Sequence, residues 1–132
     1  MKNAQLTFDE PKKTVILEFQ GFLTAEQFKQ VYINAINLIE EKQAKYFFID
    51  ASKERIIPTG TEEWLVSDLF PYAEKIAQRL GYRLRAARAE SEDIFNRLAS
   101  ERSIQHFTHQ SSQFDFQNFP NIEAALSWLY KD

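Results

Sequence analysis

The 132-residue sequence contains no cysteine, one methionine, two histidines, three glycines and four prolines. Without cysteine the chain forms no disulfide, offers no thiolate to a metal and has no thiol nucleophile. The three glycines are isolated, which excludes a glycine-rich phosphate-binding loop. So little glycine and proline leaves no room for a flexible linker, and this length fits one domain. We therefore predict a single domain over residues 1–132.

The sequence also lacks long apolar runs and a strong excess of either charge. No apolar stretch is long enough to span a bilayer, and Met1 to Gln5 does not resemble a signal peptide, so we expect a cytoplasmic protein with no membrane span. The net charge of −3 argues against a nucleic-acid partner. Aromatic residues make up 14% of the chain, with 12 phenylalanines, and we expect them to dominate the core.

The hydrophobic pattern predicts an α/β fold in the order β-β-α-β-α-β-α-β-α. We expect the first two strands to pair antiparallel and helical crossovers to make the rest parallel, giving a mostly parallel five-stranded sheet. Pro71 should bend or divide the second helix. The expected strands are 5–8, 14–19, 45–50, 82–89 and 113–117, and the expected helices are 24–42, 61–80, 91–103 and one that follows the cap Asn121.

Local signals predict the helix ends and the buried faces. Thr24 with Gln27 predicts a capping box at the start of the first helix, and Gly81 a C-cap at the end of the second. By helical period we expect the following to face the core: Tyr32 in the first helix, Leu65, Leu69, Ala73, Ile76 and Leu80 in the second, and Ile122 in the last.

A binding rim is expected where the third strand ends at Asp50, because α/β sheets present ligand-binding groups at their carboxyl edge. A polar loop then leads to a helix that carries Trp64 away from the apolar stripe of Leu65 and Leu69. Trp64 is either an exposed anchor or is buried against the loop at Pro58. The acidic residues at this end suit either the helix dipoles or a basic partner. The candidate rim comprises Asp50, Ser52, Thr59, Thr61, Glu62, Glu63, Trp64 and Ser91.

Two threonines and the two histidines are the other candidates for chemistry. Thr59 and Thr61 stand at a helix start, where a phosphate is stabilised, but Thr61 is also a good N-cap and Gly60 a good turn residue. His106 and His109 could touch one metal ion if helical, yet a zinc site needs more ligands, so we interpret them as a solvated pair near a helix end. We expect no metal and no cofactor.

The enzyme interpretation has little support in the sequence. Asp50 and Glu54 could act as paired carboxylates, but neither a nucleophile nor an oxyanion-stabilising element accompanies them. We therefore predict a protein that is not an enzyme.

One predicted strand carries Arg83, Arg85 and Arg88, although a covered parallel strand should be almost entirely apolar. At a period of two, Arg83 and Arg85 share one face and Arg88 points to the other. Their head groups reach solvent at the strand ends, or one of them is buried against a carboxylate such as Asp50 or Glu90, or lines a small polar pocket.

The order of elements resembles the STAS domain of bacterial anti-sigma-factor antagonists, and more closely the uncharacterised bacterial proteins called STAS-like or SpoIIAA-like. The matching features are Asp50, Trp64, Gly81 with Arg83 and Arg85, Phe114-Asp115-Phe116 and Ala125-Leu126-Ser127-Trp128-Leu129. The resemblance implies a STAS-like fold.

This chain departs from the antagonists at their phosphorylation element. They carry Asp-Ser-Ser-Gly where this chain has Pro58-Thr59-Gly60-Thr61. We therefore predict that an anti-sigma-factor kinase phosphorylates neither threonine.

The resulting expectation is a non-enzymatic protein-interaction or regulatory module that binds either a protein partner or its own copy, the latter as a homodimer. The alternative is a binding or carrier domain for a small apolar or amphipathic ligand, suggested by the many aromatic residues and by the kinship of STAS and CRAL-TRIO folds. A buried cavity lined by Phe and Trp favours the carrier. An acidic rim with exposed Trp64 and Ile33 favours the partner.

Overall fold

The computed structural model describes residues 3–54, 58–95 and 109–131. They form a mixed sheet of six strands in the order β1-β2-β3-β4-β6-β5. The edge strands β1 and β5 run antiparallel to their neighbours, and the central pairings are parallel. The strands are β1 (Ala4–Asp9), β2 (Thr14–Phe19), β3 (Tyr46–Ala51), β4 (Leu84–Glu90), β5 (His109–Gln110) and β6 (Phe114–Phe119).

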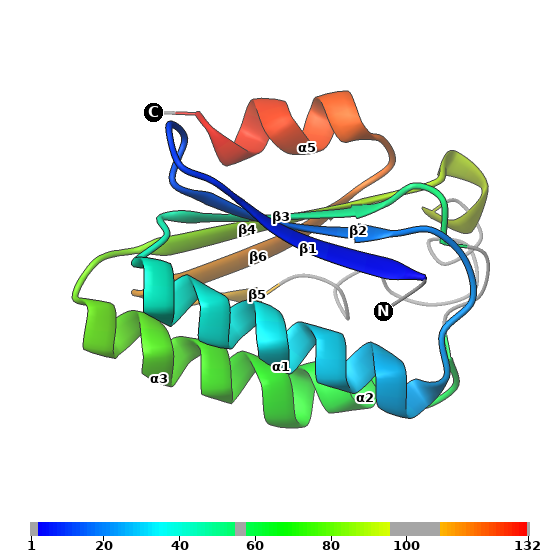
Figure 1. The fold of residues 1–132 in the computed structure, drawn as a ribbon, viewed down its shortest axis with the longest axis horizontal. Helices are drawn as coiled ribbons and strands as arrows, with labels where there is room; N and C mark the ends of the chain where they lie inside the picture. The colour runs from blue at the N-terminus through cyan, green and yellow to red at the C-terminus, as the bar shows by residue number, and fades with distance from the viewer. Residues whose placement is uncertain (1–2, 55–57, 96–108, 132) are drawn as a thin grey trace.

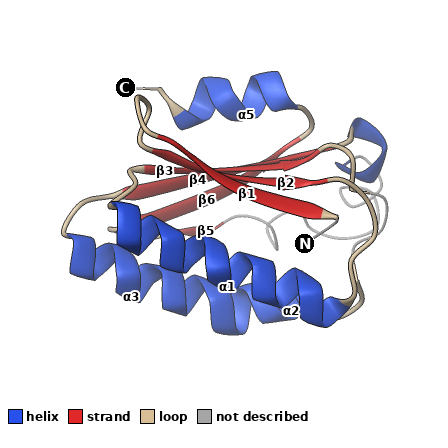
Figure 2. Ribbon diagram, in the orientation of Figure 1, coloured by secondary structure: helices blue, strands red, loops and turns tan. Residues whose placement is uncertain are grey.

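Helices cover both faces of this sheet (Figures 1 and 2). One face carries α1 (Ala25–Lys42) and a second helical stretch, made of α2 (Thr61–Trp64), the π-helical turn η1 (Leu65–Leu69) and α3 (Phe70–Leu80). The other face carries α5 (Ile122–Leu129). No helix among the described residues is long and apolar enough to cross a membrane.

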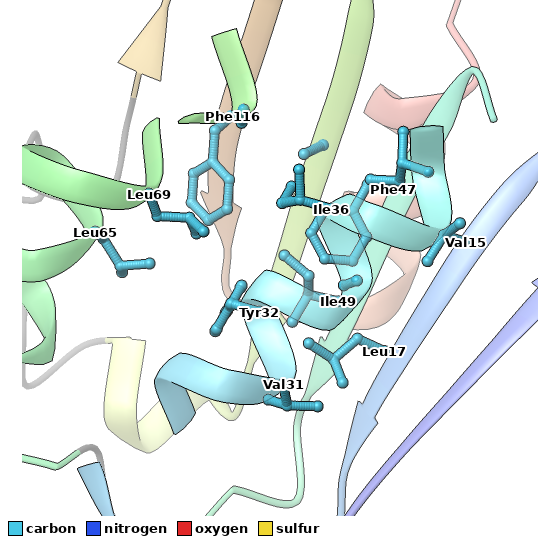
Figure 3. Packing of buried hydrophobic residues seen from close by; sticks show 14 of the residues in the cluster. Val15, Leu17, Val31, Tyr32, Ile36, Phe47, Ile49, Leu65, Leu69 and Phe116 are labelled. Carbon is cyan, nitrogen blue, oxygen red and sulfur yellow. The ribbon is translucent and has the colours of Figure 1, made fainter. Parts of the chain in front are cut away.

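The larger core lies between the sheet and the layer of α1 and α3. Figure 3 shows Val31, Tyr32 and Ile36 of α1 meeting Leu17 and Ile49 of the sheet. A smaller cluster on the other face joins Phe48, Ala87 and Ala89 to α5. The small side chains of Ala87 and Ala89 on β4 let α5 approach the sheet closely. The other face of β4 contributes Leu84 and Ala86 to the larger core, so this strand contributes residues to both cores.

Several expectations are confirmed. β1 and β2 pair antiparallel. Thr24 and Gln27 form a capping box at the start of α1, and Asn121 accepts a hydrogen bond from the amide of Ala124 at the start of α5. Gly81, with a φ of 81°, ends α3 in the left-handed conformation that glycine adopts without strain. These local signals fixed the ends of the elements.

Other expectations need correction. The sheet has six strands, not five, because the two-residue β5 pairs with β6, and a strand that short has no periodicity to detect. β4 begins at Leu84 rather than at Tyr82, whose hydroxyl donates to the carbonyl of Ala44 in the preceding turn. Ile122, expected to point inward, is 37% exposed. Of the third helix, residues 92–95 are helical, and the remainder lies outside the described residues.

The helix expected over 61–80 is divided just before Pro71, where η1 occupies Leu65–Leu69. Proline has no amide hydrogen, and its ring crowds the carbonyl four residues earlier. In the π-helical turn the amide of Phe70 bonds to the carbonyl of Leu65 instead, which relieves that crowding. The turn also shifts the buried face, so Phe70 and Ala77 join the predicted Leu65, Leu69, Ala73 and Ile76 in the core.

Candidate functional site

The carboxyl half of β4 places two charged side chains inside the protein. Alternation along the strand puts Arg88 and Glu90 on the face of Leu84 and Ala86, which α1 and α3 cover. Both residues are 1% exposed. Of the three outcomes considered for the arginines, burial against Glu90 therefore holds for Arg88.

Three polar side chains surround the Arg88 guanidinium. Its Nε donates to the hydroxyl of Tyr32 on α1 at 2.9 Å. One terminal nitrogen pairs with Glu54, which follows β3, and the other pairs with Glu90. Arg88 thus ties together α1, β4 and the loop after β3, all at the carboxyl end of the sheet.

This cluster, defined as Tyr32, Glu54, Arg88 and Glu90, carries two acids for one base. Burial raises the pKa of Glu54, and the nearby Arg88 opposes that rise only in part. Burial also raises the pKa of Tyr32 to about 12, so its hydroxyl stays neutral. Burial alone would lower the pKa of Arg88, but Tyr32 and Glu54 raise it overall, and the guanidinium stays charged. Folding therefore favours the protonated form of Glu54 relative to the unfolded chain.

Polar groups beside the cluster remain without partners. Glu54 Oε2 and both side-chain atoms of Asn118 are buried and make no hydrogen bond in the described part of the protein. Asn118 lies opposite Arg88 on the adjacent strand β6. Buried polar groups normally find a protein or water partner. This end of the sheet therefore brings several buried polar groups together.

The expected rim residues at the ends of β3 and β4 do come together. Asp50 accepts hydrogen bonds from the amide and hydroxyl of Ser52, and Ser91 Oγ accepts from the amide of Ile94 as a helix cap. Ser52 and Ser91 line one open hollow with the start of α5, lined also by Glu90, Glu92, Pro120, Asn121, Ile122 and Glu123. Asp50 and Ser91 thus lie at the same end of the sheet.

The threonines at the start of α2 differ in exposure. Thr59 is exposed, whereas Thr61 is 0% exposed and its hydroxyl donates to the carbonyl of Pro58 at 2.7 Å. Thr61 is the first residue of α2, so its interpretation as a plain N-cap is wrong. Gly60, with a φ of 85°, is the turn residue that was expected.

Trp64 lies on a different surface from Ser52 and Ser91. With Ile33 of α1 and Leu69 and Tyr72 of the second helical stretch, it lines an open groove of about 310 Å³. Asp68 stands at the same groove, and the Lys29 ammonium lies 6.0 Å from the Trp64 ring centre. Trp64 is half-buried and packs against the core. Glu63, the residue before Trp64, is exposed. The side chain of Glu62 lies outside the described part of the protein.

The other two arginines lie at the amino end of β4, at the end of the sheet opposite the buried cluster. Arg83 pairs with Asp115, and Arg85 donates to the carbonyls of Trp128, Leu129 and Lys131 at the end of α5. All of these except Leu129 line a polar pocket of about 310 Å³. His109 lies in β5, stacks on Phe70 and is half-buried, so it is neither helical nor fully solvated. His106 lies outside the described residues.

Within the described residues, no group of three or more acidic, histidine or cysteine side chains is placed to hold a metal ion. Asp50 and Glu54 bind different partners and do not form a carboxylate pair. The pattern of β4 predicted Glu90 as one carboxylate against which an arginine is buried, but it did not join Glu54 or Tyr32 to that pair. The signal in the sequence was that β4, an otherwise apolar strand, carries a charged residue on each of its two covered faces, Arg85 on one and Arg88 on the other.

Comparison with known proteins adds no relative: no protein-family model and no curated protein matches this chain. The STAS-like resemblance therefore stays a prediction.

Proposed function

We propose that this protein is a non-enzymatic interaction module, a cytoplasmic STAS-like domain that binds a protein partner through the groove between α1 and the α2–η1 turn. The observation that carries the proposal is the groove itself, where the half-buried side chains of Ile33, Trp64 and Tyr72 stand partly open to solvent beside the buried Leu69. Half-buried aromatic residues in such a position are typical anchors of protein interfaces.

The shape of the groove favours a side chain of a protein partner as its occupant over a small apolar ligand that the protein would carry. A carrier needs an enclosed cavity that buries most of its ligand. This groove is open, and about 310 Å³ accommodates one or two side chains. Its single acid, Asp68, and the exposed Glu63 favour a partner segment with an apolar anchor and a neighbouring base.

The test compares the two tryptophans. Trp64→Ala should weaken binding of the partner by about 2 kcal/mol or more, as for other aromatic anchors. Trp128→Ala is the matched control, because Trp128 is also half-buried but packs on Phe119 on the other face of the sheet, away from the groove. The partner is captured from the lysate of the native host with wild-type protein, identified by mass spectrometry, and titrated calorimetrically against both variants. If Trp64→Ala lowers the melting temperature by several degrees while binding is unchanged, Trp64 is a core residue and the proposal fails.

A charge test probes the expected partner chemistry. Glu63→Lys with Asp68→Lys should slow association and flatten its dependence on salt, because charges at the rim of an interface mainly steer the encounter. Stopped-flow association rates over a range of salt concentrations measure this effect. An unchanged rate would show that the partner is not basic.

A further inference from the structure

No strand in the described part of the protein pairs with the outer edge of β1. β1 is the first strand of the sheet, and within the described residues it pairs with β2 alone (Figure 1). An edge strand of this kind is a template on which another strand can add.

The register identifies which backbone groups face outward. The amide of Gln20 donates to the carbonyl of Asn3, so this pair is hydrogen-bonded. Hydrogen-bonded and non-bonded pairs alternate along an antiparallel ladder. Gln5 and Thr7 therefore bond to β2, whereas Ala4, Leu6 and Phe8 direct their amides and carbonyls away from the sheet.

β1 lacks the features with which edge strands usually prevent pairing. It is six residues long, has the sequence Ala-Gln-Leu-Thr-Phe-Asp, and contains neither proline nor lysine. Its side chains sort by face, with Leu6 and Phe8 partly buried against the core and Gln5 and Thr7 exposed. The outer edge of β1 is thus open to another strand, and the strand has one apolar face and one polar face.

We propose that β1 pairs antiparallel with β1 of a second copy of this chain, about a two-fold axis at Leu6. This is the register in which all three outward-facing residues find a partner: Leu6 faces Leu6 of the second copy, and Ala4 faces Phe8. The inference is independent of the groove at Trp64.

Side chains and charges match in this register. Opposed residues of an antiparallel pair lie on the same face, so Ala4, Leu6 and Phe8 form one apolar surface across the axis and cover each other's exposed area. On the other face Gln5 meets Thr7. Residues 4–8 contain no charge, and Asp9 falls opposite Asn3, so no like charges oppose each other. Both α1 helices, and with them both grooves, then lie on one face of a joined sheet.

Two double variants with changes at the same exposed positions test the pairing by analytical ultracentrifugation. Gln5→Lys with Thr7→Lys places like charges opposite each other twice and should weaken the dimer about tenfold or more. Gln5→Glu with Thr7→Lys places opposite charges there and should preserve or tighten it. A wild type that stays monomeric up to high micromolar concentrations overturns the proposal. So does equal dimerisation of the two variants, whether both dimerise or neither does.

Amide hydrogen exchange gives a second readout that needs no variant. In wild type, protection of the Leu6 and Phe8 amides should fall when the protein is diluted, because their bonds cross the dimer axis. Protection of the Gln5 and Thr7 amides, which bond to β2, should not change. Protection of Leu6 and Phe8 that does not depend on concentration would also overturn the proposal.

Discussion

Two arginines at opposite ends of β4, one inside the strand and one just before it, have very different environments. At its carboxyl end Arg88 is 1% exposed and is surrounded by Tyr32, Glu54 and Glu90. Just before its amino end Arg83 keeps a side chain that is 48% exposed, although it also pairs with an acid, Asp115. The comparison indicates that the contribution of an ion pair to stability depends on its access to water as well as on its partners.

The largest difference should appear on removal of each guanidinium. Arg88→Met leaves two carboxylates buried without a base and should lower the free energy of unfolding by about 3–5 kcal/mol. Arg83→Met should cost less, about 1–3 kcal/mol, because it leaves one carboxylate rather than two without a base, and although Asp115 is only 6% exposed, it lines a pocket through which water reaches the place of Arg83. Urea denaturation at neutral pH measures both.

Equal losses for Arg88→Met and Arg83→Met would show that access to water does not separate the two ends of β4. As a control, Arg88→Met combined with Glu54→Gln and Glu90→Gln should recover part of the loss, because the unpaired buried charges are then gone.

A smaller difference is expected for the two tyrosine hydroxyls. Tyr32→Phe removes the acceptor of the buried Arg88 Nε and should lower the free energy of unfolding by about 1.5–3 kcal/mol, since the lost bond involves a charge. Tyr82→Phe removes a half-buried bond to the carbonyl of Ala44 and should cost about 0.5–1.5 kcal/mol. Both changes preserve the ring, so thermal and urea denaturation report the hydroxyl alone. A larger loss for Tyr82→Phe would reverse the comparison.

The smallest effect is a dependence on pH. Folding raises the pKa of Glu54 above its ordinary value of 4.5, so the folded state favours the protonated acid. The resulting stability is fully present below about pH 4.5 and is lost as the pH rises through the folded-state pKa. Glu54→Gln should remove this loss, so the variant gains stability relative to wild type as the pH increases.

Urea denaturation from pH 4 to pH 8 measures that difference, with Glu63→Gln as the control at an exposed acid on the same side of the sheet. A Glu54→Gln variant that loses stability relative to wild type with rising pH would mean that Glu54 is an ionised partner of Arg88 throughout.

The sequence predicted the elements well where local signals were strong. The Thr24–Gln27 capping box, the Asn121 cap and Gly81 each marked the end of a helix correctly, because each signal involves residues within a few positions of one another. β5 was missed because two residues carry no period, and the π-helical turn was missed because its bonds depend on how Pro71 fits against the preceding turn.

The candidate site was predicted in part. Asp50, Ser52 and Ser91 were expected at one edge because strand ends can be found from a hydrophobic run and the polar residue that follows it. Their separation from Trp64 could not be predicted, because the direction of a side chain on a short α2 depends on how α2 and η1 pack against α1.

The amino-acid sequence by itself determined the α/β class, the antiparallel start of the sheet and the face to which each arginine of β4 points, because periodicity and capping are local properties of the chain. The tertiary structure alone decided which arginine is buried and which residues meet it. Tyr32, Glu54 and Arg88 are far apart in the sequence, and their contact depends on the parallel register of β3 and β4 and on α1 crossing above them. Burial is a property of all packed layers together, so no single segment of sequence contains it.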